Sequence, residues 1–137
     1  MEAIKESGTS TNGMVRNGVA SVGDNPTETG WGQISWLVGA EEMPGAEQTF
    51  GVVTIAPGQR NPLHAHPNCE ELLYVVSGAC SHKLGDEIYD LKPGDVIRIP
   101  RGIKHWAKCT SDEPLVAVIS FSSPDRRVEA HEEGGVA

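Results

Sequence analysis

Four side chains able to bind a metal ion stand in two spaced motifs of this 137-residue chain. Gly58–Gly78 reads G-x5-H-x-H-x4-E-x6-G, and Gly94–His105 reads G-x5-P-x-G-x2-H. The motifs contribute three histidines and one glutamate: His64, His66, Glu71 and His105. Imidazole and carboxylate groups suit divalent transition metals, and four protein ligands on an octahedral ion leave two positions for substrate, oxygen or water. The sequence therefore predicts a metal site that can bind a ligand and react with it.

The spacing within the first motif indicates how its ligands converge. Side chains on a strand alternate between faces, so His64 and His66 point the same way with Cβ atoms about 6.5 to 7 Å apart. A turn is favoured after these histidines, and Glu71 begins the strand that returns. Glu70 competes for the carboxylate role, but only Glu71 keeps a gap of six residues to Gly78. We therefore expect Glu71 to be the acidic ligand.

The elements that must position these groups are short β-type runs. From Trp31 onward such runs alternate with turn signals about every 8 to 12 residues, a pattern typical of an all-β sandwich or barrel. The expected runs are 33–38, Thr49–Ile55, Glu70–Ser77, Ala79–Leu84, Ile88–Leu91, Val96–Ile99, Lys104–Cys109 and Leu115–Phe121. Pro-Gly pairs at 57–58 and 93–94 predict type II turns, because glycine accepts the positive φ that these turns require.

The chain length allows one domain. Residues 1–30 are polar and predict an arm that is flexible or exchanged with a partner, 31–123 form the barrel domain, and 124–137 form a charged tail. In the tail, Ser123 as a cap and Pro124 at a first helical position hint at a helix.

Composition excludes several classes of partner. A formal net charge of -8 argues against nucleic acid, because phosphate binding needs a basic surface. No apolar run approaches the roughly 20 residues of a membrane helix and the N-terminus is polar, so we expect no membrane association and a cytoplasmic location. Cys69, Cys80 and Cys109 are an odd number without short paired spacing, which favours reduced thiols.

The two motifs resemble the two conserved motifs of the cupin superfamily over about Gly51–Phe121, and all nine specified positions fit. The 15 residues between the motifs are similar to the short spacer of small microbial cupins, whereas Cys109 stands where the family often has Asn. The resemblance implies a cupin-type double-stranded β-helix, a jelly-roll barrel of two antiparallel sheets with the four ligands inside. It also implies one divalent transition metal (Mn, Fe, Ni, Co, Cu or Zn) and a homodimer.

A fifth imidazole is a second candidate for chemistry. His82 shares one strand face with Cys80 and Leu84, which predicts that it points to the interior. An imidazole beside a metal can act as a proton shuttle because its pKa is near neutrality. The alternative is a core histidine that is hydrogen-bonded to a neighbour.

Weaker candidates for substrate binding lie near the site strands. Arg60 has the parity of the two motif histidines and would line the mouth of the barrel, unless Pro62 breaks this parity and leaves the arginine in solvent. Tyr74, Trp106 and Phe121 either form the wall of a pocket or pack between the sheets.

We therefore expect a metal-dependent enzyme acting on a small oxygen-rich molecule. With Fe, Mn or Ni it would be a dioxygenase, and with Zn, Mn or Fe an isomerase, lyase or cyclase acting on a sugar-derived or keto/enol substrate. Glu71 would act as a base, with His82 as the second candidate. The alternatives are a non-catalytic barrel that binds a sugar or another small molecule, and a structural domain in which the metal is a staple.

Overall fold

The computed structural model describes residues 18–132, and this part of the chain contains eleven β-strands and no helix. The strands are β1 Pro26–Glu28, β2 Gly32–Val38, β3 Thr49–Ile55, β4 His64–Ala65, β5 Glu71–Ser77, β6 Cys80–Leu84, β7 Glu87–Leu91, β8 Val96–Ile99, β9 His105–Cys109, β10 Leu115–Phe121 and β11 Glu129–Ala130. The expected all-β class is confirmed, and the predicted bounds of β3, β8 and β10 are those observed.

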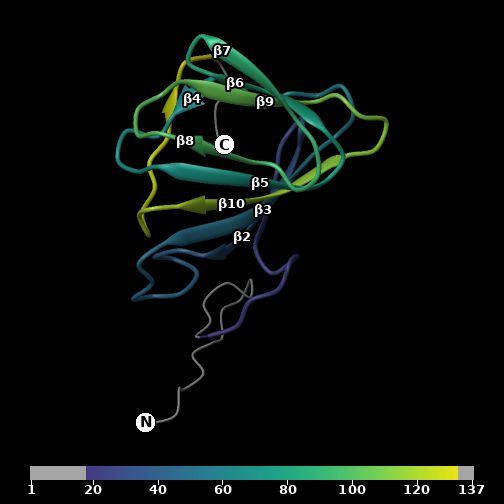
Figure 1. The fold of residues 1–137 in the computed structure, drawn as a ribbon. Helices are drawn as coiled ribbons and strands as arrows, with labels where there is room; N and C mark the ends of the chain where they lie inside the picture. The colour runs from purple at the N-terminus through teal and green to yellow at the C-terminus, as the bar shows by residue number, and fades with distance from the viewer. Residues whose placement is uncertain (1–17, 133–137) are drawn as a thin grey trace.

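The strands form two antiparallel sheets that face each other. The six-stranded sheet has the order β1-β2-β3-β10-β5-β8, and the five-stranded sheet has the order β11-β4-β9-β6-β7. Figure 1 shows β8, β5, β10, β3 and β2 side by side in one layer, with β9, β6 and β7 in the layer above. This arrangement is the predicted jelly-roll barrel of two sheets.

Alternation of burial along each strand builds the core. In β10, Leu115, Ala117, Ile119 and Phe121 are buried while the residues between them are half-buried on the outer side. Because the pleat gives a strand period two, every second side chain of β3, β5 and β10 packs into the space between the sheets. This shared interior also receives the candidate ligands.

Two Pro-Gly turns orient the strands around the site. Gly58 and Gly94 have φ of 79° and 96°, in the left-handed region that glycine adopts without strain. Each turn is closed by a backbone hydrogen bond, 3.0 Å from Gln59 N to Ala56 O and 3.0 Å from Asp95 N to Lys92 O. Both predicted type II turns are therefore observed, and the first of them directs the chain into the histidine motif.

The ends of the described region pair with the sheets. β1, which falls within the predicted arm, pairs with β2, whereas residues 1–17 lie outside the described part of the chain. The hint of a helix at Ser123 and Pro124 is wrong. The Pro124 carbonyl accepts a hydrogen bond from Ala40 N instead of serving a helical turn, and the chain continues into β11 beside β4. Over residues 18–132 no helix suited to crossing a membrane occurs.

Candidate metal centre

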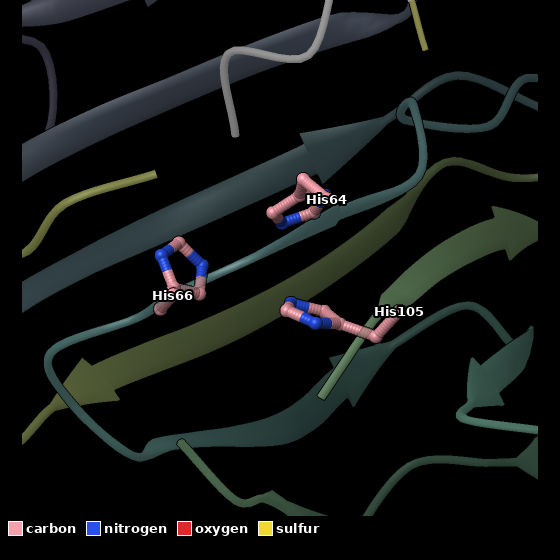
Figure 2. Close-up of side chains that lie close together, drawn as sticks. All are labelled: His64, His66 and His105. Atoms are coloured by element: carbon pink, nitrogen blue, oxygen red, sulfur yellow. The ribbon is translucent and has the colours of Figure 1, made fainter. Parts of the chain in front are cut away.

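The predicted ligands meet inside the barrel from both sheets. His64 on β4 pairs directly with His105 on β9 in the five-stranded sheet, and His66 follows β4 by one residue. Glu71 opens β5 in the opposite sheet. The three histidines are each 2% exposed and Glu71 is 5% exposed. One ring nitrogen from each histidine lies within 4.8 Å of the others, and Figure 2 shows the three rings converging.

Backbone carbonyls fix the orientation of all three imidazoles. The Nδ1 atoms of His64, His66 and His105 lie 2.6, 2.8 and 2.9 Å from the carbonyl oxygens of Pro62, Arg127 and Ile103. A carbonyl oxygen only accepts, so each Nδ1 carries a proton and donates it, which leaves Nε2 as the metal-binding atom. His66 Nε2 is buried and has no hydrogen-bond partner among residues 18–132. This set of donors fits a metal ion.

Glu71 supplies a negative charge at the same point. Its Oε1 lies 3.2 Å from His105 Nε2 and 3.4 Å from His66 Nε2. Burial alone would raise the pKa of the Glu71 carboxyl, but the imidazoles of His105 and His66 that contact it hold this pKa below its ordinary value. A buried carboxylate facing ring nitrogens requires a cation between them, which is either a proton on the imidazole or a divalent ion.

The histidines respond differently to burial. Desolvation, assisted by the nearby His105, lowers the pKa of His64 to about 3, so this ring is neutral, as a ligand must be. Burial also opposes the charged form of His105, but the contact with Glu71 outweighs burial and raises the His105 pKa. A metal ion therefore competes with a proton at His105.

The structure separates the two adjacent glutamates. Glu71 points into the barrel, whereas Glu70 lies at the surface with its side chain 38% exposed, and its Oε1 is 2.8 Å from Arg98 Nε. The predicted preference for Glu71 over Glu70 agrees with this placement.

His82 lies beside the three-histidine cluster. Its ring stacks on that of His105, with centroids 5.9 Å apart and an interplanar angle of 6°. The side chain is 1% exposed, and its Nδ1 has no hydrogen-bond partner in the region that the structure describes. Burial lowers the pKa of His82 to about 4, so the ring is neutral near pH 7. The predicted inward orientation is observed.

A narrow cavity adjoins the ligands. Its volume is about 20 Å³, enough for one or two water molecules. Its lining residues are Ile34, Val53, Ile55, Asn61, His64, Glu71, Leu73, His82, His105, Ala107, Ile119 and Phe121. The Phe121 ring also packs edge-on against His66, with centroids 5.0 Å apart. The walls are thus mainly apolar, which excludes water and strengthens polar contacts inside.

The other weaker candidates lie away from this cavity. The Arg60 guanidinium is 2.9 Å from Glu132 Oε1 and stacks over the Trp106 ring, 5.1 Å from its centroid. Tyr74 is 46% exposed on the outer side of β5, because its neighbour Leu73 takes the inward position. Of the four aromatic and arginine candidates, Phe121 is the one that lines the cavity.

Sequence reasoning missed Asn61, which occupies the inward position expected for Arg60. Asn61 lines the cavity and is 9% exposed, and its Oδ1 accepts a hydrogen bond of 2.8 Å from Ala107 N. Pro62 breaks the strand alternation before His64. Of the two alternatives for Arg60, the one that leaves its side chain outside the barrel therefore agrees with the structure.

The C-terminal segment 125–132 was missed as part of the site. It pairs through β11 with β4 and provides the carbonyl of Arg127 to His66. Asn68 joins the same segment to the histidine loop, since its Nδ2 donates to Asp125 O and its Oδ1 accepts from Arg127 N, both at 2.9 Å. No local pattern in the sequence predicts these long-range hydrogen bonds.

The chain belongs to the cupin family, since residues 51–121 match the family model described as the cupin domain. Germin-like protein 5-1 of Oryza sativa subsp. japonica is 30% identical over 115 residues, covering 77% of this chain and 51% of that protein. The chain spans about half the length of the curated relatives it matches.

Among solved structures, the oxalate decarboxylase of Lactobacillus farciminis superposes with a TM-score of 0.73 at 26% identity, covering 78% of this chain and 33% of that one. The Bacillus subtilis oxalate decarboxylase, which has Mn(II) centres, superposes with a TM-score of 0.73 at 24% identity, covering 78% of this chain and 30% of that one. In this chain, the three converging histidines could hold a metal ion, and imidazole suits divalent transition metals.

Proposed function

We propose that this protein is a divalent-metal-dependent enzyme acting on a small oxygen-rich organic molecule. The observation that carries the proposal is the convergence of three Nε2 atoms, each oriented by a carbonyl on Nδ1, beside the buried Glu71 carboxylate. His64, His66, Glu71 and His105 would hold one ion. Manganese is the first metal to test because a similar structure contains it, and Fe, Ni, Co, Cu and Zn suit the same ligands.

When bound, the metal supplies Lewis-acid polarisation of a substrate oxygen. The chain's own residues then bind and orient the substrate. His82 Nδ1 is free to hydrogen-bond a substrate oxygen, and the Asn61 amide faces the same space. Glu71 is the acceptor for a proton released beside the ion, and His82 is the second candidate for this role. The apolar wall, which includes Phe121, keeps bulk water from the reacting groups.

Two reaction classes suit this arrangement. A dioxygenase would use the ion to hold substrate and oxygen together, whereas an isomerase, lyase or cyclase would use the Glu71 carboxylate to move a proton next to a polarised carbonyl. Oxalate and other small dicarboxylates and keto acids join the test substrates because oxalate decarboxylases share the fold.

A second candidate function is binding without turnover. Outside the four ligands, the polar residues that line the cavity in the described part of the chain are Asn61 and His82. Since Asn61 Oδ1 is already bonded to Ala107 N, few groups remain for acid-base chemistry. If the protein catalyses no reaction, these walls would support a barrel that binds a small sugar or acid at its metal.

The test begins with protein purified without an affinity tag. Its metal content is measured, and the protein is then loaded separately with Mn, Fe, Ni, Co, Cu or Zn. Oxygen consumption and product formation are followed with oxalate, keto acids, uronates and catechols, using a His64→Ala, His105→Ala double variant as the control. We expect turnover that depends on the metal and is absent in the control. Binding without turnover for every metal would favour the second candidate, and a control that still holds one ion per chain would refute the site.

A further inference from the structure

Three strands of the six-stranded sheet begin or end together beside the metal centre. Phe121, the last residue of β10, pairs with Glu71 at the start of β5 and with Thr49 at the start of β3. The segment after β10 then passes from this sheet to the other one, where β11 pairs with β4, and Figure 1 shows it in yellow. Side chains at this end of the barrel therefore lie near the metal ligands without being ligands themselves.

A pocket with a larger volume than the metal cavity lies at this end. Its volume is about 250 Å³, which approaches the roughly 300 Å³ of the smaller ligand pockets in proteins. We call it the Arg126 pocket, and its lining residues are Trp36, Ala40, Glu41, Glu42, Thr49, Pro124, Asp125 and Arg126. All of these residues lie outside 51–121, the range that matches the cupin family model. The pocket therefore belongs to the segments that flank the family match.

Arg126 places a positive charge in this pocket. Its guanidinium carbon lies 4.0 Å from the centroid of the Trp36 ring and 5.3 Å from that of Phe121. Contact with aromatic rings holds a guanidinium by its face and leaves the N–H donors at its edge available. Within residues 18–132 these donors have neither a hydrogen-bond acceptor nor an ion-pair partner. Burial lowers the pKa of Arg126, but an arginine stays protonated, so the half-buried charge persists.

The acidic side chains of the Arg126 pocket do not neutralise this charge. Glu42 Oε2 accepts a hydrogen bond of 2.8 Å from Asn25 Nδ2, while Glu41 and Asp125 are exposed to solvent. A cation that has lost part of its hydration without gaining an anion is costly, so the arrangement suits an anion that arrives from solution. Three carboxylates around the pocket repel a polyanion, which favours a ligand that brings one negative group to this point.

Phe121 separates the Arg126 pocket from the metal centre by one ring. The Phe121 centroid lies 5.0 Å from that of His66 on one side and 5.3 Å from the guanidinium carbon on the other. These two contacts place the guanidinium no more than about 10 Å from the His66 ring. A small organic acid is long enough to have one end at Arg126 and the other end near the metal ligands.

We propose that Arg126 binds a carboxylate of the substrate, and that the substrate is an organic acid whose other oxygen-bearing end reaches the metal centre past Phe121. The inference rests on the proposed function, because it names the class of substrate for the same centre. A planar guanidinium binds a carboxylate through two parallel hydrogen bonds, which the point charge of a lysine cannot reproduce. Arg126 would thus select acids over neutral sugars.

The test measures binding rather than turnover. Oxalate, succinate, glutarate and adipate are titrated by calorimetry into manganese-loaded wild type, Arg126→Gln and Arg126→Lys. We expect Arg126→Gln to weaken the tightest dicarboxylate about 10- to 100-fold, because hydrogen bonds to a charged group are lost. Arg126→Lys should give an intermediate affinity, because it keeps the charge but not the fork. Catechol binds metals without a carboxylate, so its affinity should be the same in all three proteins.

The matched control is Arg98→Gln, which removes a surface guanidinium already paired with Glu70 at 2.8 Å. Its dicarboxylate affinity should equal that of the wild type. Metal content and thermal melting show whether each variant is folded, and if Arg126→Gln is not, Arg126→Lys carries the comparison. The inference is overturned if no dicarboxylate binds the wild type, if Arg126→Gln binds it equally well, or if Arg98→Gln loses as much affinity.

Failure of this inference can be told apart from failure of the proposed function. Turnover of an acid with an unchanged KM in Arg126→Gln would place substrate binding elsewhere and leave the metal-dependent enzyme intact. Dicarboxylate binding that depends on Arg126, without turnover for any metal, would support the carboxylate site and favour a barrel that binds an acid without converting it.

Discussion

Asn68 is expected to control metal affinity although it does not touch the ion. Its side chain makes two hydrogen bonds to segment 125–132. The second holds the backbone N–H of Arg127, and the carbonyl of the same residue accepts a hydrogen bond from His66 Nδ1 at 2.8 Å. In Asn68→Ala both bonds are lost, which costs about 1 to 3 kcal/mol at about 0.5 to 1.5 kcal/mol each. The Arg127 carbonyl is then free to turn away, and the His66 ring loses its fixed orientation.

Loss of a group that orients a metal ligand lowers affinity about 10- to 100-fold. This range corresponds to about 1.4 to 2.8 kcal/mol, which agrees with the two lost bonds. The assay is the metal dissociation constant, measured by competition with a chelator. Asn68→Asp keeps the acceptor for Arg127 N–H but loses the donor to Asp125 O, so its affinity should fall between those of the wild type and Asn68→Ala.

The control for Asn68 is Ser81→Ala, which removes a surface hydrogen bond of 2.9 Å from Ser81 on β6 to Asp90 on β7. Its metal affinity should equal that of the wild type. A merely structural role for Asn68 would lower the melting temperature without changing the dissociation constant. An unchanged dissociation constant in Asn68→Ala would therefore refute the reasoning that segment 125–132 orients His66.

Three further predictions concern the ligands and the thiols. Glu71→Gln should weaken metal binding at least about tenfold because it removes the negative charge at the site. Glu70→Gln should leave the metal affinity unchanged because Glu70 pairs with Arg98 at the surface. Equal effects of the two substitutions on the metal dissociation constant, measured by chelator competition, would count against Glu71 as a ligand. Removing the metal by dialysis against a chelator should lower the free energy of unfolding. The expected loss is about 2.7 kcal/mol relative to protein with free metal at 100 times its dissociation constant. A melting temperature that does not change with metal would contradict the site. Burial raises the pKa of the Cys80 thiol to about 12. Little of the Cys80 thiolate therefore exists at pH 8. A thiol reagent whose reaction is followed by absorbance should label Cys80 in the denatured protein but not in the native protein. Rapid labelling of the native protein would contradict this prediction.

The sequence predicted those parts of the site that depend on local alternation. The facing of His64 and His66 and the inward turn of His82 follow from strands of period two, and the structure places these side chains as expected. The choice of Glu71 over Glu70 followed from the six-residue gap to Gly78, and Glu71 is the buried one of the two. The same rule left two placements open for Arg60. In the structure Pro62 interrupts the strand, and Asn61 takes the inward position.

The remaining parts depend on contacts that no local pattern contains. Arg127 serves His66 across 61 residues of chain, and the hint of a helix after Ser123 gave way because that segment bonds to the histidine loop instead of to itself. Propensity and capping signals describe a segment alone, whereas these bonds exist only after the barrel has closed. The outward placement of Val52, Val118 and Tyr74 on the six-stranded sheet was equally unpredictable. Alternation does not reveal which row of residues faces the core when both rows are apolar.

Side chains on the two faces of β5 lie in different surroundings. On β5, Glu71 points into the cavity while Leu72 and Tyr74 point outward, because successive side chains alternate. β5 is held on both sides by β10 and β8, so its backbone position depends on the sheet and not on either face alone. A substitution at Tyr74 should therefore leave Glu71 in place. Metal content measured on a Tyr74→Glu variant tests this independence of the two faces: we expect one ion per chain, and loss of the ion from a folded variant would refute it.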